Sequence, residues 1–96
     1  MAETSQIINI LIVSENERMI ALTRSILSRE ESLELIDQMV TPKNLYSVIG
    51  ESQPDIILLD FDFQEHPFDL LDNLTSQFPW CAIVAILTES EMLNLE

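Results

Sequence analysis

Four segments of the chain are rich in aliphatic residues. They alternate with segments in which apolar residues recur every three or four positions. Residues 7–13, 55–60 and 82–87 are nearly continuous apolar runs, which predict strands that are covered on both faces of a sheet. Residues 33–40 mix Leu, Ile, Met and Val with acids and predict an outer strand, whose free edge needs less apolar cover. We therefore expect these four segments to form one sheet.

The segments between the apolar runs carry apolar residues every three or four positions, which is typical of amphipathic helices. Thr41 and Pro42 predict the N-cap and first position of one helix, and Pro67 predicts the start of another. The predicted helices cover residues 19–29, 42–53, 67–77 and 88–96. Strands that alternate with helices predict right-handed βαβ units and a parallel sheet, and the length suits one domain over residues 1–96.

The chain is strongly acidic. Its 17 Asp and Glu residues against four Lys and Arg give a net charge of -13, which repels phosphate backbones and anionic lipid surfaces. We therefore expect no nucleic-acid partner and no membrane partner for this segment. The single cysteine, Cys81, lies in an apolar run, and the N-terminus lacks the basic flank of a signal peptide; both favour a cytoplasmic location.

Polar residues follow the predicted strands at the edge where open parallel sheets place their functional sites. Ser14 and Glu15 come after the first strand, Asp60 ends the third, and Thr88 follows the fourth. If these three strands are neighbours, their polar residues converge on one small acidic pocket. Two carboxylates with a backbone carbonyl and water would suit Mg²⁺, which prefers hard oxygen ligands.

Three motifs make the chain similar to a known family. Leu-Ile-Val before an acidic turn (residues 11–15), Pro-Asp-Ile-Ile-Leu-Leu-Asp (54–60) and Ala-Ile-Leu-Thr (85–88) resemble the strand ends of response-regulator receiver domains. The resemblance covers about residues 7–95 and implies a flavodoxin-like α/β fold, with the strands in the spatial order second, first, third, fourth. Compared with the family, this sequence has only the beginning of the fourth helix, and it has no counterpart of the fifth strand and the fifth helix. The implied function is that of a signal-transduction receiver in a two-component phosphorelay.

The resemblance also implies roles for individual residues. Asp60 would be the phosphoacceptor, and Thr88 would contact the phosphoryl group. Glu15, Asp60 and the backbone carbonyl of Asp62 would bind Mg²⁺, with Ser14 as a weak ligand. A histidine kinase or a phosphotransfer protein would be the partner that supplies the phosphoryl group.

The chain departs from the family at several of these positions. Ser14 stands where the family carries an acid, so the affinity for Mg²⁺ should fall. Glu89 brings negative charge next to Thr88, where the family favours a small residue. Neither Lys43 nor any arginine occupies the place of the family's phosphate-binding lysine. These departures favour an alternative, an atypical and phosphorylation-independent module for protein interaction or dimerisation.

Further expectations concern partners and capping. Without a fifth strand and helix, the fourth strand would be a free edge and one face of the sheet would keep uncovered aliphatic surface. This predicts a homodimer, or a domain-swapped pair, in which that strand and residues 92–95 bury against a second copy; the alternative is a segment of a longer regulator whose remainder completes the fold. Ser14 and Glu17 also match a capping box for the first helix, as Thr88 and Glu91 do for the last. The sequence offers no glycine-rich phosphate loop and no activated nucleophile beside a base, so we expect no enzymatic activity of its own.

Overall fold

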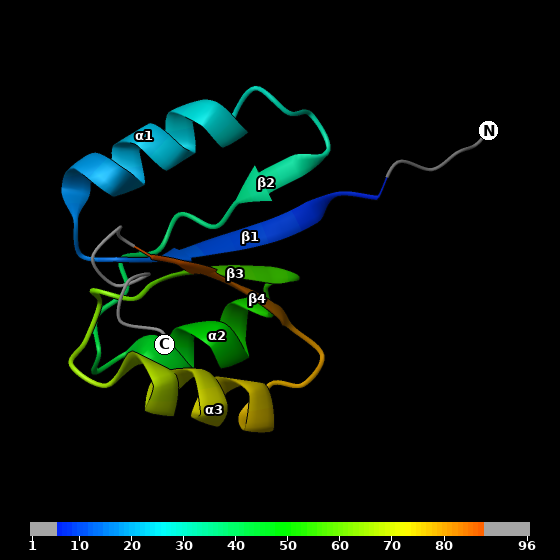
Figure 1. Ribbon diagram of the computed structural model, residues 1–96. Coiled ribbons are helices and arrows are strands. Elements are labelled where there is room, and N and C mark those ends of the chain that lie inside the picture. The colour runs from blue at the N-terminus through cyan, green and yellow to red at the C-terminus, as the bar shows by residue number, and fades with distance from the viewer. Residues whose placement is uncertain (1–5, 88–96) are drawn as a thin grey trace.

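The computed structural model describes residues 6–87, which form a four-stranded parallel sheet with helices on both faces (Figure 1). The strands are β1 (Ile8–Val13), β2 (Leu33–Leu35), β3 (Ile56–Asp60) and β4 (Ala82–Ile86). The helices are α1 (Glu17–Leu27), α2 (Leu45–Ser52) and α3 (Pro67–Gln77). The strand order β2-β1-β3-β4 confirms the predicted α/β fold, an incomplete flavodoxin-like sheet. The helix predicted at residues 88–96 lies outside the described residues.

One face of the sheet carries the hydrophobic core. Leu11 and Val13 of β1 lie beside Ile57 and Leu59 of β3 in parallel register, and all four belong to the core cluster on the side of α2 and α3 (Figure 1). Successive strand residues point to opposite faces, so this core takes every second residue of each strand. The two helices add Leu45, Val48, Ile49, Leu70 and Leu74.

The opposite face is covered more thinly. Among the described helices, α1 alone lies on this face, where it packs beside β2, and none of its residues is buried (Figure 1). The expectation that β4 is covered on both faces is wrong, because Ala82, Val84 and Ala85 are exposed. β4 hydrogen-bonds to β3 and is the outer strand of the described sheet, which explains this exposure.

Two element boundaries also differ from those expected. The helix predicted from Pro42 begins at Leu45, because the Thr41 N–H donates to Asn44 Oδ1 at 2.7 Å and closes a turn ahead of the helix. The outer strand ends at Leu35 instead of continuing to residue 40, after which the chain crosses towards α2. The longest described helices, α1 and α3, have 11 residues each, and no helix within residues 6–87 is long and apolar enough to span a membrane.

Candidate functional site

Ser14 and Asp60 meet at the carboxyl edge of the sheet. Val13 and Leu59 are partners in the parallel register of β1 and β3, so the residue that follows each of them lies at the same level. The Ser14 hydroxyl donates a hydrogen bond to Asp60 Oδ2 at 2.8 Å. Both residues are buried, with exposed fractions of 4% and 6%, and they are the buried polar residues of the described chain. The predicted convergence of these two strand ends is therefore observed.

The Asp60 carboxylate is held at both oxygens. Its Oδ1 accepts a hydrogen bond from the backbone N–H of Asp62 at 3.0 Å, while Oδ2 accepts from Ser14. A buried carboxylate needs such donors to offset the loss of water, and hydrogen bonds to a charged acceptor are stronger than neutral ones. An ionised carboxylate has about four lone-pair sites. Asp60 therefore keeps acceptor capacity beyond these two bonds.

The same hydroxyl links Asp60 to the start of α1. Ser14 Oγ accepts the backbone N–H of Asn16 at 3.0 Å, and Asn16 Oδ1 accepts the N–H of Met19 at 3.1 Å. Asn16 has extended backbone angles and is the N-cap of α1. The predicted capping box of Ser14 and Glu17 is therefore wrong, because the hydroxyl of Ser14 is directed to Asp60. Asn is among the best N-cap residues, so Asn16 was the signal that could have shown the true helix start.

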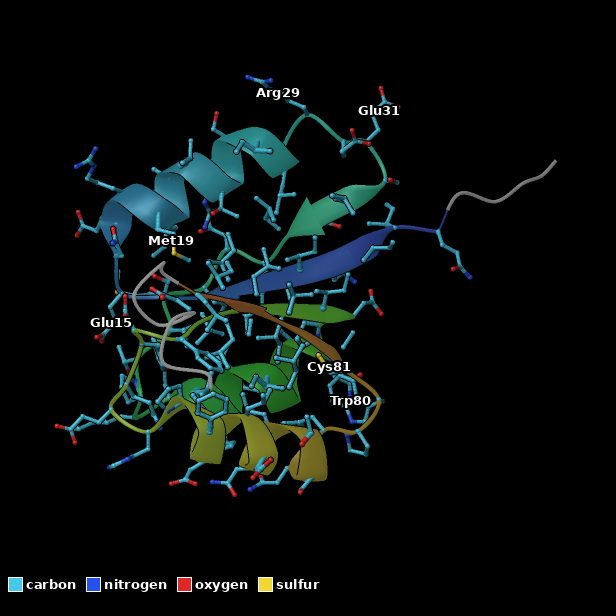
Figure 2. The ribbon with its side chains drawn as sticks, viewed as in Figure 1. Glu15, Met19, Arg29, Glu31, Trp80 and Cys81 are labelled. Atoms are coloured by element: carbon cyan, nitrogen blue, oxygen red, sulfur yellow. The ribbon has the colours of Figure 1, made fainter. Side chains whose placement is uncertain are left out.

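Of the other predicted site residues, the structure describes Glu15 and Asp62. Glu15 is exposed where β1 ends, next to the start of α1, whereas Trp80 and Cys81 lie towards the opposite end of the sheet (Figure 2). Asp62 is also exposed. Thr88 and Glu89 lie outside the described residues.

A magnesium site was expected from Glu15, Asp60, the carbonyl of Asp62 and Ser14. Within residues 6–87, no group of three or more His, Cys, Asp and Glu side chains is arranged to hold a metal ion. The donors at this edge are oxygen atoms, the type that Mg²⁺ prefers, and the structure brings Asp60 and Ser14 into contact. The ligand set as a whole stays a prediction.

Two cavities that the sequence did not indicate lie between α1 and the segment of residues 36–41. They have volumes of about 180 and 160 Å³, and Ser14, Ile20, Met39 and Val40 line both. The larger one also contains Arg24, whose guanidinium lies 3.7 Å from the carboxylate of Asp37. Ser14 thus contacts the Asp60 carboxylate and also lines both cavities beside α1.

The chain was also compared with known proteins. No protein-family model matches it, and neither curated proteins nor solved structures yielded a match.

Proposed function

We propose that this chain is a receiver-type signalling domain in which Asp60 accepts a phosphoryl group. The observation that carries the proposal is the position of Asp60, the one buried carboxylate within residues 6–87, at the carboxyl end of the inner strand β3. Open parallel sheets place their functional crevices at this edge. The similarity of residues 54–60 to the acceptor strand of receiver domains supports the same assignment.

The transfer would proceed by attack of an Asp60 oxygen on phosphorus. The bond from phosphorus to the donor breaks as the new P–O bond forms, and the donor leaves with the electron pair. A phosphohistidine of a histidine kinase or phosphotransfer protein is the proposed donor, and an acyl phosphate supplies the same group in vitro. Ser14 and the Asp62 N–H orient the carboxylate for attack, because each fixes one of its oxygens.

The proposal includes a weak Mg²⁺ site at the same edge. Asp60, Glu15 and the backbone carbonyl of Asp62 would hold the ion, and Ser14 would add an uncharged oxygen. Bound Mg²⁺ supplies positive charge beside the phosphoryl oxygens. Because Ser14 brings no charge, we expect a lower affinity than a carboxylate at this position would give.

A second candidate function is supported by the hydrogen bonds of Asp60. Both carboxylate oxygens are satisfied inside the protein, and the hydroxyl of Ser14 takes the place of a second buried acid. Such a centre is stable without a phosphoryl group or metal ion. It suits a phosphorylation-independent interaction module that uses the receiver fold as a scaffold.

Intact-mass measurement after incubation with acetyl phosphate and Mg²⁺ separates the two functions. We expect one added phosphoryl group on the wild-type chain, none on Asp60→Asn, and unchanged addition on Asp62→Asn, which keeps the backbone groups of residue 62. Ser14→Asp should raise the extent of addition if a second acid improves Mg²⁺ binding. No addition to a wild-type chain that circular dichroism shows to be folded would reject the phosphoacceptor and leave the interaction module.

A further inference from the structure

The larger of the two cavities beside α1 has aliphatic walls. Its volume is about 180 Å³, and it is lined by Ile12 of β1, Ile20 of α1 and Ile36 just after β2, together with the segment of residues 37–40. Ile20 and Arg24 are four residues apart, so they share the face of α1 that is turned towards this space. The cavity thus combines an apolar interior with the guanidinium of Arg24.

The volume of the cavity limits the size of the molecule that fits. An apolar cavity of about 150 Å³ holds a molecule as large as benzene, whereas pockets for drug-sized ligands have volumes of about 300–1,000 Å³. The second cavity, of about 160 Å³, shares Ser14, Ile20, Met39 and Val40 with the first, so the two adjoin. A small molecule with a short aliphatic body therefore fits the larger cavity, and a nucleotide or a peptide is too large for it.

Side chains of both charges stand at the mouth of the larger cavity. Arg24 Nη2 lies 3.7 Å from Asp37 Oδ1, and the two side chains are 40% and 95% exposed. Water screens such an ion pair, which contributes little to stability, so each group can exchange its partner for a ligand. The fork of donors on Arg24 matches a carboxylate, and Asp37 accepts hydrogen bonds from an ammonium group. The pair therefore matches the two charged ends of a zwitterion.

A ligand with a single charge fits this mouth less well. A carboxylate alone meets Asp37 beside Arg24, and it approaches a chain of net charge -13, which repels it. An amine alone meets the positive charge of Arg24. Ser14 also lines the cavity, but its hydroxyl already donates to Asp60 and accepts from the Asn16 N–H. The polar anchors for a ligand are therefore Arg24 and Asp37.

We propose that the larger cavity binds a free amino acid with a branched aliphatic side chain, leucine or isoleucine. The α-carboxylate binds Arg24, the α-ammonium group binds Asp37, and the side chain packs among the isoleucines of the wall. Met39 lines both cavities and is 85% exposed, so a bound ligand also shields part of its side chain from water. Binding does not require phosphorylation, so Asp60→Asn should bind the amino acid like the wild-type chain.

Titration of the isotope-labelled full chain with L-leucine and with L-isoleucine, followed by amide NMR, tests the proposal. We expect one saturable site with a Kd below about 1 mM, and shift changes at Ile20 and Val40. Isocaproate lacks the ammonium group, isoamylamine lacks the carboxylate, and glycine lacks the aliphatic body. Each should bind at least about tenfold more weakly. A folded chain that shows no shift changes with either amino acid up to about 10 mM would overturn the proposal, as would any of the three analogues that binds as tightly.

Variants test whether the amino acid occupies this cavity. Arg24→Met keeps an apolar stem without the charge, and Asp37→Asn removes the opposite charge; each should weaken binding at least about tenfold. Arg18→Met, at a position of α1 that lines neither cavity, and Asp72→Asn, on α3, are the matched controls and should bind like the wild type. Ile20→Phe fills the cavity and should abolish binding, with thermal unfolding as the check that each variant is folded. Affinity that persists in both Arg24→Met and Asp37→Asn would place the ligand elsewhere and overturn the proposal.

Discussion

The two faces of the sheet differ in how much of their surface the described helices bury. The face towards α2 and α3 includes Leu45, Ile49 and Leu74, whose exposed fractions are 0 to 1%. On the other face, α1 has no buried residue. Ser14 and Asp60 belong to this second face, because they continue the rows of Ile12 and Leu58. The candidate site thus lies beside the part of the fold that is held least tightly, where a local change costs the least free energy.

The largest effect should come from the densely packed face. Leu74→Ala removes a fully buried side chain from α3 and should lower the free energy of unfolding by about 2–5 kcal/mol. Leu27→Ala makes the same change at a half-buried position of α1 and should cost about 1 kcal/mol. Urea unfolding of both variants measures the difference. Equal losses would show that the two faces contribute alike and would remove the contrast drawn between them.

The next largest effect should come from the hydroxyl that joins the site to α1. Ser14→Ala takes one donor from the buried Asp60 and one acceptor from the Asn16 N–H, and should cost about 1–3 kcal/mol. Ser25→Ala, at an exposed position of α1, is the matched control and should be neutral or slightly stabilising. A double-mutant cycle with Asp60→Asn should show coupling between Ser14 and Asp60. Additive losses would mean that the hydrogen bond contributes nothing to stability.

A smaller effect should mark the start of α1. Asn16→Ala removes the side chain that caps the Met19 N–H and should cost about 1 kcal/mol, whereas Asn16→Asp keeps the cap. Asn73→Ala, at an exposed position of α3, serves as the control for loss of an asparagine. Amide hydrogen exchange in the first turn of α1 should become faster in Asn16→Ala alone. Unchanged exchange would place the helix start elsewhere.

The smallest effect concerns Cys81, on the packed face. Burial, and after it the charge of Asp55, raise the pKa of its thiol above the ordinary value of 9.0. The thiol of the unfolded chain therefore ionises first, so the free energy of unfolding should fall slightly as pH rises from about 9 towards the folded-state pKa. Cys81→Ala should lack this decrease. Alkylation at pH 8 should be much slower at Cys81 than at Leu22→Cys in the Cys81→Ala background; equal rates would mean that the packed face opens readily.

Much of the candidate site followed from the sequence because it lies at strand ends. Asp60 ends an apolar run that could only be an inner strand, and Ser14 follows another, so neighbouring strands had to bring them together. Which donors Asp60 would use did not follow. The Asp62 N–H reaches Oδ1 only through the local turn after β3, and Ser14 could equally have capped α1. Choices between hydrogen-bond partners of similar strength depend on tertiary distances.

The sequence by itself determined the class of fold, because continuous apolar runs separated by helical periods leave few arrangements other than a parallel sheet between helices. It also determined that an acid would end the inner strand β3. Only the tertiary structure decided which residues of β4 are exposed and that α1 is half covered, because an apolar run indicates what a strand can bury and does not show what packs against it. Tertiary structure likewise directed the Ser14 hydroxyl to Asp60, since a hydrogen bond between residues 46 positions apart exists only once the sheet has aligned them.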